Sequence, residues 1–273
     1  DSKIPYLLST VDEISDAKDV TLSPDNQLAY IADGSGRMHI LDISNPDTPA
    51  ELSFLEGINT PNAISLSNDG ETLIVSTEQG LQTVDVKDPL QPVAIGHLGT
   101  NGNSTDIELS LNGHLCYMVD QVNGLKVIDL MERNANGTIN VNTNIHSVGN
   151  YGLESNVFGI ATTKDDKLAY IANNKAGLQI FDIDDLQNPR LINTFDTFGR
   201  TSDVKLSLDG KTAYLSDYSD GLLLLDVSNP EIPELLSHFE TDGYVADSFL
   251  SNSEQVIFLA DFHEGFKIVD ISN

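Results

Sequence analysis

The stretch Thr201–Phe239, TSDVKLSLDGKTAYLSDYSDGLLLLDVSNPEIPELLSHF, decides the fold, because related copies of it fill nearly all of the remaining sequence. It contains four short runs with the alternation or the apolar content that is typical of strands. Turn residues separate these runs at Asp209-Gly210, Asp217–Gly221 and Asn229-Pro230. Leu222–Leu225 is apolar at every position, which indicates a strand covered on both faces. The stretch therefore predicts a four-stranded antiparallel sheet that stacks between similar sheets.

The copies align on the residue that we expect to open the first strand of each sheet. These residues are Asp19, Ala63, Asp106, Gly159, Asp203 and Asp247. Their spacing is 43 or 44 residues, except for the interval of 53 that follows Asp106. In that interval Met131–Gly137 replaces the usual Asn-Pro turn, and Asn140–Asn156 adds polar residues. We expect the additional length to be loop, with the outer strand of this sheet within Thr138–Val148.

The two chain ends together supply the one repeat that is still missing. Asp270–Asn273 matches Asp226–Asn229, and Ile4–Ser9 matches Ile232–Ser237. A closed ring gains from such a split repeat, because pairing the termini removes an open sheet edge. The sequence therefore predicts an all-β fold, a six-bladed β-propeller of four-stranded antiparallel blades, whose N-terminal strand completes the last blade. It also predicts a single domain over residues 1–273.

Four segments and one turn resemble the LVIVD repeat family. They are Gly124–Asp129, Gly177–Asp182, Gly221–Asp226 and Gly265–Asp270, with Asp42–Pro46 as the turn. The resemblance extends over essentially the whole chain. It implies a bacterial or archaeal propeller, commonly exported or surface-attached, for which an activity is usually not established, and it carries over no catalytic residues. The third blade departs most from the family pattern, because no Asn-Pro-x-x-Pro follows its Asp129.

The charge of the chain restricts its partners. Forty-two acidic residues stand against 14 basic ones, which gives a net charge of −28. Such a protein repels nucleic acid and anionic membrane surfaces. No apolar run approaches the length of a membrane helix, so we expect no membrane insertion. We expect a monomer in the extracellular space, on the cell surface or in the periplasm, with a protein or a neutral or cationic ligand as its partner.

The single cysteine, Cys116, excludes an internal disulfide bond. It occupies the repeat position of Ala29, Ala169 and Ala213. We therefore expect a small buried strand residue rather than a nucleophile.

An aspartate ends the third strand of every blade. These residues are Asp42, Asp85, Asp129, Asp182, Asp226 and Asp270. A carboxylate at this position can accept hydrogen bonds from the backbone N–H groups of the turn that follows. We expect these six residues to serve the fold.

Four blades carry two further aspartates 14 residues apart, with the first hairpin turn midway between them. The pairs are Asp19 with Asp33, Asp106 with Asp120, Asp203 with Asp217, and Asp247 with Asp261. Ala63 with Thr77 and Gly159 with Asn173 take these positions in blades 2 and 4. An antiparallel hairpin brings both members of a pair to one end, and first strands line the channel of a propeller. We therefore expect eight carboxylates near one channel mouth.

Two interpretations of these eight carboxylates stay open. In the first, backbone donors neutralise them: the first aspartate caps the incoming loop, and the second accepts N–H groups of the turn that follows it. In the second, they bind Ca²⁺, which favours six to eight oxygen ligands. Calcium is the one cofactor that the pattern suggests.

The sequence offers two classes of function. The first is a non-catalytic binding module of the cell envelope or exterior, whose partner-binding face lies at the acidic channel mouth and includes Thr77, Asn173, Tyr218, Phe262 and His263. The second is a calcium-dependent hydrolase of the lactonase or phosphoesterase type, with the metal at the channel mouth. This alternative is an analogy at the level of the fold. We favour the binding module, because no motif supplies a catalytic residue.

Overall fold

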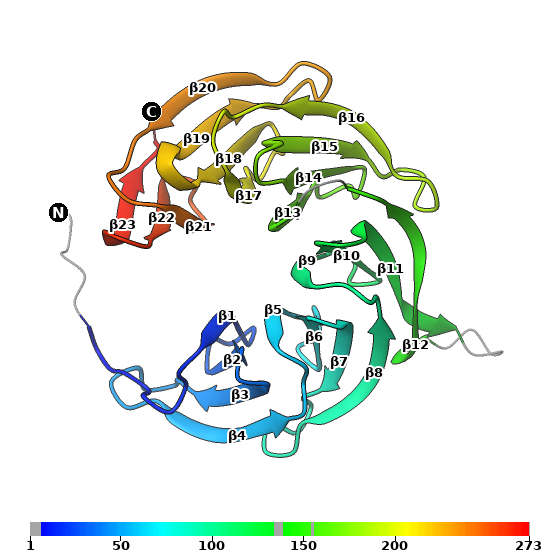
Figure 1. Ribbon diagram of the computed structural model, residues 1–273. Coiled ribbons are helices and arrows are strands. Elements are labelled where there is room, and N and C mark those ends of the chain that lie inside the picture. The colour runs from blue at the N-terminus through cyan, green and yellow to red at the C-terminus, as the bar shows by residue number, and fades with distance from the viewer. Residues whose placement is uncertain (1–6, 134–138, 154–155, 273) are drawn as a thin grey trace. The chain divides into compact units, whose positions relative to one another are not determined.

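The computed structural model describes residues 7–133, 139–153 and 156–272, and in these residues the structure is almost wholly β (Figure 1). The helical structure of the described residues is limited to the 3-10 helix η1 (Tyr218–Asp220). The chain groups into two compact units. Unit 1 comprises the residues up to 104 together with 131–145, and unit 2 comprises 105–130 and the residues from 146 onward. The single domain over 1–273 stays a prediction.

Unit 1 contains two four-stranded sheets whose strands follow chain order and pair antiparallel. Blade 1 consists of β1 (Ala17–Leu22), β2 (Leu28–Asp33), β3 (Arg37–Asp42) and β4 (Ala50–Glu56). Blade 2 consists of β5 (Pro61–Leu66), β6 (Thr72–Thr77), β7 (Gly80–Asp85) and β8 (Val93–Gly99). A buried apolar cluster joins the two sheets and includes Tyr30 and Ile40 from blade 1 with Ile64 and Val75 from blade 2. The alternation and turn residues of the sequence thus give two stacked sheets.

Blade 3 follows the same strand order and contributes residues to both units. Its strands are β9 (Ser104–Leu109), β10 (Leu115–Asp120), β11 (Gly124–Arg133) and β12 (Ile139–Tyr151). The outer strand begins within the predicted range and ends three residues beyond it. The expectation that the additional residues of this repeat form a loop is wrong, because most of them lengthen β11 and β12. No turn-forming Asn-Pro follows Asp129, so nothing ends β11 at that point.

Unit 2 also contains blades 4, 5 and 6. Blade 4 consists of β13 (Gly159–Thr162), β14 (Leu168–Ala172), β15 (Leu178–Asp182) and β16 (Arg190–Phe195). Blade 5 consists of β17 (Thr201–Leu206), β18 (Thr212–Asp217), β19 (Gly221–Asp226) and β20 (Glu234–Phe239). Blade 6 is described through β21 (Val245–Leu250), β22 (Val256–Asp261) and β23 (Gly265–Asp270).

The predicted closing strand falls largely outside the described residues. The repeat match places it around Ile4–Ser9, of which residues 4–6 are not described, and residues 7–10 belong to no strand. Ring closure by the N-terminal strand therefore stays a prediction.

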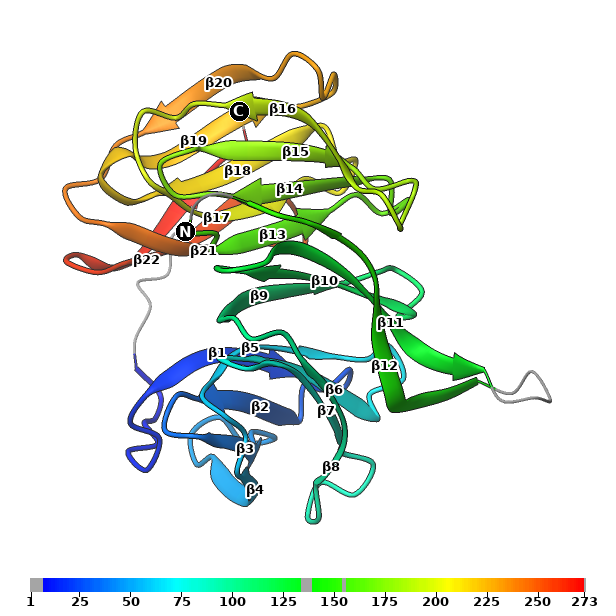
Figure 2. The same ribbon diagram turned by 45° about the vertical axis from the view of Figure 1, so that its right-hand side comes forward.

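Apolar clusters join consecutive sheets of unit 2, and Figure 2 shows blades 4 and 5 lying face to face. Val204 and Leu225 of blade 5 pack against Tyr170 and Ile180 of blade 4. Other clusters join blade 3 to blade 4 and blade 5 to blade 6. The first strands β13, β17 and β21 lie next to one another. Cys116 is free and fully buried, as predicted, and burial raises the pKa of its thiol.

The aspartates that end the third strands accept turn N–H groups, which confirms their structural role in five blades. The donors are the N–H groups of the residues two positions further on: Ser44, Lys87, Asp184, Ser228 and Ser272, at 2.9–3.1 Å from Asp42, Asp85, Asp182, Asp226 and Asp270. In blade 3, β11 continues past Asp129, so the turn does not form there.

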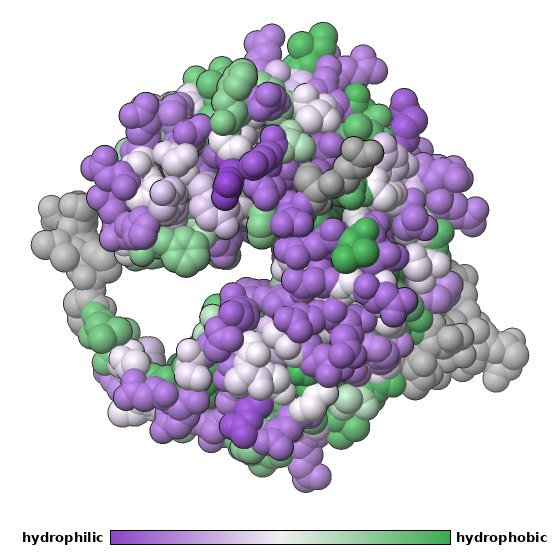
Figure 3. Space-filling view, in the orientation of Figure 1, coloured by the Kyte–Doolittle hydropathy of each residue, from purple (hydrophilic) through white to green (hydrophobic). Residues whose placement is uncertain are grey.

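The surface agrees with the acidic composition. Hydrophilic residues prevail over both units on the side seen in Figure 3, interrupted by scattered apolar ones. Within the described residues no helix has the length and apolar character needed to span a bilayer.

Candidate functional site

The first aspartate of each predicted pair lies inside its strand rather than at its start. β17 begins at Thr201, which pairs with Asp217, whereas Asp203 pairs with Ser216. A β-bulge between the two pairings accommodates the additional residue, Ser202. The same shift precedes Asp19 in β1, as well as Ala63 and Asp247 in β5 and β21. The prediction that these residues open the first strands is therefore wrong in these blades, because each strand gains two residues before the bulge. It holds for Gly159, the first residue of β13.

Three of the first aspartates join one sheet to the next. Asp19 Oδ2 accepts a hydrogen bond from the N–H of Ile64 in blade 2 at 2.8 Å. Asp106 Oδ2 accepts one from Ile160 in blade 4 at 2.9 Å. Asp203 Oδ2 accepts from both the backbone N–H and the hydroxyl of Ser248 in blade 6, at 3.2 and 3.0 Å.

These bonds correct one part of the structural interpretation. Asp19, Asp106 and Asp203 link neighbouring blades, whereas we expected them to cap the incoming loop. At the corresponding position of blade 4, Gly159 lies so close to blade 5 that an added Cβ would be 3.0 Å from the Cα of Asp203. A side chain there would have to displace the backbone.

The second aspartates accept backbone N–H groups near the end of the second strand. Asp33 Oδ1 accepts from Ser35 at 2.8 Å. Asp120 Oδ1 accepts from Val122 and Asn123 at 2.8 and 2.9 Å, and Asp261 Oδ1 from His263 and Glu264 at 3.1 and 3.2 Å. These three bonding patterns confirm the predicted turn acceptors.

Asp217 differs from the other second aspartates, because η1 replaces the turn after it. Its Oδ1 accepts from the N–H of Arg200 at 2.7 Å, and its Oδ2 accepts from the Thr201 hydroxyl at 3.1 Å. Both donors belong to the segment that enters blade 5. Asp261 also holds an incoming segment, since it accepts the N–H of Tyr244 at 3.0 Å.

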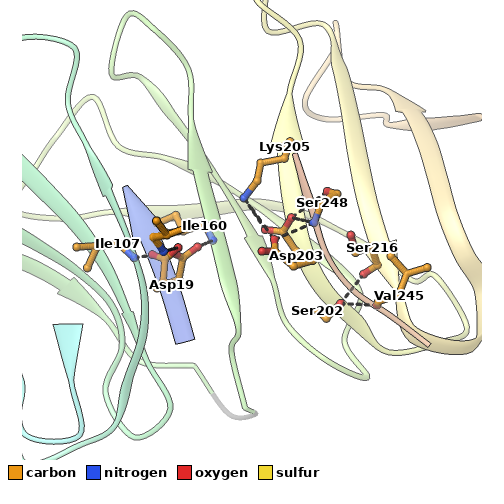
Figure 4. A network of polar contacts seen from close by, with 12 residues as sticks. Asp19, Ile107, Ile160, Ser202, Asp203, Lys205, Ser216, Val245 and Ser248 are labelled. Carbon is orange, nitrogen blue, oxygen red and sulfur yellow. Dashed lines mark hydrogen bonds and ion pairs between the residues drawn. The ribbon is translucent and has the colours of Figure 1, made fainter. Parts of the chain in front are cut away.

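Lys205 provides positive charge among the carboxylates of unit 2 (Figure 4). Its ammonium lies 2.9 Å from Asp203 Oδ1 and 4.0 Å from Asp247 Oδ1. Burial favours the neutral form of Asp203, but the Lys205 charge and the hydrogen bonds around it outweigh burial and hold the pKa of Asp203 below its usual value. Burial, and then the charge of Asp203, raise the pKa of Asp247. The pKa values of Asp203 and Asp247 therefore shift in opposite directions.

Glu108 on β9 belongs to the same electrostatic group. Burial raises the pKa of this half-buried carboxyl to about 7, Lys205 opposes the shift, and Asp203 and Asp166 add to it. Asp106, Asp203 and Asp247 in turn outweigh the effect of burial on Lys205 and raise its pKa. This group can exchange a proton near neutral pH, with Lys205 as its permanent cation.

Replacing Glu108 with glutamine should remove part of the pH dependence of stability. A carboxyl whose folded pKa is raised contributes stability that is complete below its unfolded pKa and is lost as the pH rises through the folded value. We therefore expect E108Q to gain stability relative to wild type between about pH 5 and pH 8 in denaturant titrations. Glu78→Gln at an exposed turn is the control. Parallel pH profiles of E108Q and wild type would contradict the shift.

The eight aspartates proposed as metal ligands belong to both units. Asp19 and Asp33 lie in unit 1, and the other six lie in unit 2. Within unit 2, the structure brings Asp203 and Asp247 together at Lys205, whereas Asp120, Asp217 and Asp261 hold separate loops. In the described part of the chain no group of three or more His, Cys, Asp or Glu residues is placed to hold a metal ion. Calcium binding stays a prediction.

The five residues of the predicted partner-binding face divide into two groups. Thr77 and Asn173 are buried and bond within their own sheets, Thr77 to the carbonyl of Gly80 and Asn173 to the side chain of Gln179. Tyr218, Phe262 and His263 instead lie in loops of blades 5 and 6.

Tyr218 and His263 lie against a third ring, that of Tyr244, which the sequence alone did not reveal. The ring of Tyr244 lies 6.3 Å from that of Tyr218 and 5.0 Å from that of His263, measured between centroids. Tyr244 therefore connects the loops of blades 5 and 6. Phe262 is 71% exposed, and Phe198, in the segment held by Asp217, is 93% exposed. We call Phe198, Tyr218, Tyr244, Phe262 and His263 the aromatic patch.

Unit 1 contains a second polar arrangement that sequence reasoning missed. His39 is buried on β3, with Nε2 3.2 Å from Asp33 Oδ2 and Nδ1 2.6 Å from Glu51 Oε1. Both ring nitrogens thus face carboxylates. The one available signal was a polar residue three positions before the aspartate that ends the third strand, which Gln179 of blade 4 shares. In blade 4, Asn173 Nδ2 donates to Gln179 Oε1, at the place where His39 faces Asp33 in blade 1.

The six antiparallel sheets define the fold as a six-bladed β-propeller, and solved structures resemble it. A functionally unknown protein from Desulfotomaculum acetoxidans matches with a TM-score of 0.74 and 16% identity, over 94% of this chain and 83% of that chain. A structure described as a putative 6-phosphogluconolactonase from Bacteroides fragilis matches with a TM-score of 0.75 and 14% identity. The match covers 96% of this chain and 82% of that chain. A chain of the mitotic checkpoint complex matches with a TM-score of 0.76 and 16% identity, over 97% of this chain and 80% of that chain. At these identities the matches show the fold alone.

The sequence itself assigns the family. LVIVD repeats match residues 15–54, 101–132, 166–197, 198–241 and 244–273, which is more than half of the chain. The protein belongs to the LVIVD repeat family. No functionally curated protein matches the sequence.

Proposed function

We propose that this protein is a non-catalytic binding module of the cell envelope or exterior, which binds a protein or a neutral or cationic ligand through the aromatic patch. The observation that carries the proposal is the exposure of aromatic rings in neighbouring loops of blades 5 and 6. Contiguous exposed apolar side chains are costly in water and mark interaction surfaces. Aromatic residues also supply much of the binding energy at protein interfaces. The acidic composition and the family resemblance support a location outside the cytoplasm.

The alternative function, a calcium-dependent hydrolase, has less support, because the carboxylates of the first strands already have partners within the protein. Asp19, Asp106 and Asp203 each bond the backbone of a neighbouring sheet. Lys205 places its ammonium against Asp203, where a bound cation would otherwise lie. These contacts favour a structural use of the carboxylates. The lactonase among the similar structures supports the alternative only through its fold.

A site-specific photo-crosslinker tests the binding function. We expect a photoreactive phenylalanine analogue at Phe262 to give a discrete adduct with a component of the native cell envelope. The same analogue at Leu90, 61% exposed in blade 2, should give none. Measuring the thermal midpoint with calcium and with chelator, and testing lactone and phosphoester hydrolysis, addresses the alternative. If no adduct formed and the protein hydrolysed a lactone or phosphoester only with calcium, the hydrolase would be the better assignment.

A further inference from the structure

The aromatic patch is held in place by buried carboxylates. Asp217 and Asp261 accept the N–H groups of Arg200 and Tyr244, the residues that follow two glycines. An added Cβ at Gly199 or Gly243 would collide with these same carboxylates. Two equivalent segments therefore enter blades 5 and 6 in a fixed conformation. Fixed loops lose little conformational freedom when a partner binds.

The loops that carry the aromatic patch are also strongly acidic. Their carboxylates outside the buried pair are Asp196, Asp220, Glu240, Asp242 and Glu264, and their one basic residue is Arg200. Asp196 bonds the N–H of Phe198, and Glu264 pairs with Lys267. The exposed Glu240 and Asp242 flank the approach to Tyr244 in sequence. The patch thus combines aromatic faces with an excess of negative charge.

Aromatic faces and carboxylates attract the same kind of group. The face of a tyrosine or phenylalanine ring carries negative potential and binds the ammonium of lysine or the guanidinium of arginine. Carboxylates beside such rings add long-range attraction and select against anionic partners. The apolar area of Phe198 and Phe262 suits the hydrocarbon parts of the same segment.

Building on the proposed function, we propose that the aromatic patch binds a polypeptide segment that carries lysine or arginine side chains next to apolar residues. The cationic group lies against Tyr244 and its neighbours, and the acidic loop residues surround it. The partner is thus a protein with a basic, partly apolar segment, and a second acidic surface is excluded.

Defined fluorescent peptides of about a dozen residues test this inference by anisotropy. One peptide alternates lysine or arginine with leucine, and a second replaces every basic residue by glutamine. We expect the basic peptide to bind wild type and the neutral one to bind at least about tenfold more weakly. Tyr244→Ala and Phe262→Ala should each weaken binding of the basic peptide about tenfold.

The controls separate the patch from the overall charge of −28, which attracts any cationic peptide. Phe54→Ala removes an aromatic ring of similar exposure, 46% against 44% for Tyr244, from blade 1. Asp47→Asn is the control for Asp242→Asn. It changes the net charge by the same amount, but it lies in the β3–β4 turn of blade 1. We expect Asp242→Asn to weaken binding more than Asp47→Asn, and the alanine variant of Phe54 to bind like wild type.

The outcomes distinguish the two proposals. Equal binding of both peptides, with loss in the Tyr244 variant, would overturn the cationic partner and leave the binding function standing. Binding of the basic peptide that is unaffected by the Tyr244 and Phe262 variants, yet abolished at about 0.5 M salt, would mean non-specific attraction and overturn the inference. A crosslink at Phe262 in the envelope fraction would then still support the binding module.

Discussion

Replacing His39 with leucine is expected to lower the free energy of unfolding by about 3 to 5 kcal/mol, because it leaves buried Asp33 without the imidazole that pairs with it. In the wild-type protein Asp33 and His39 are each only 3% exposed in their side chains, and Glu51 faces the other ring nitrogen. Two acceptors on one imidazole require N–H groups on both of its nitrogens, or a protonated carboxyl. Leucine can supply neither donor.

The loss should depend on pH in a defined direction. Burial opposes the ionisation of Asp33, but the N–H of Ser35 and then His39 outweigh burial and hold the pKa of Asp33 below its usual value. Such a carboxyl stabilises the fold above its unfolded pKa, and this contribution is lost as the pH falls through the folded value. The deficit of H39L should therefore be largest near neutral pH and shrink below about pH 4, as denaturant titrations would show.

Blade 4 provides a matched control, because Asn173 and Gln179 hold the positions of Asp33 and His39 and bond at 2.7 Å without any charge. We expect Gln179→Leu to cost only about 1 to 2 kcal/mol. The double variant Asp33→Asn with His39→Gln should recover a large part of the loss caused by H39L. Equal losses in H39L and Q179L, or no recovery in the double variant, would rule out the ionic explanation.

Replacing Asp203 with alanine is expected to cost about 3 kcal/mol, because it removes the acceptor of two bonds from buried Ser248 and the partner of Lys205. The variant would weaken the contact between blades 5 and 6. We expect faster amide exchange at Ser248 and over β21, measured by hydrogen exchange and by chemical denaturation. The ion pair of Lys205 with Asp247, at 4.0 Å, remains in this variant.

Asp19→Ala is the matched control for this prediction. Asp19 makes the corresponding bond to Ile64, but it is only half-buried, whereas Asp203 is buried. Its removal should cost about 1 kcal/mol. If the two alanine variants were equally stable, the ion pair and the serine bonds would contribute nothing beyond the shared backbone bond, and the special role of Asp203 would be refuted.

The aromatic patch shows where sequence reasoning about the site ended. Tyr218, Phe262 and His263 could be placed on loops, because they follow aspartates at fixed repeat positions. Tyr244 could not be joined to them, since it precedes a different strand and its neighbours come from two blades. Thr77 and Asn173 hold the same repeat position as Asp217 and Asp261, and all four residues are buried. The accessible aromatic residues lie in the loops that follow this position.

The sequence by itself determined the number of sheets, their strand order, the turn aspartates and the burial of Cys116, because these depend on local periodicity and turn chemistry that every repeat restates. Tertiary structure alone decided what the first aspartates contact. They lie at the third position of their strands, and their partners are backbone groups of the next blade about one repeat away, or in blade 3 somewhat further, which carry no mark in the sequence. The buried contacts of His39 likewise arise from side chains that spacing does not connect. Contacts between neighbouring repeats follow from packing, and packing is visible only once the sheets are stacked.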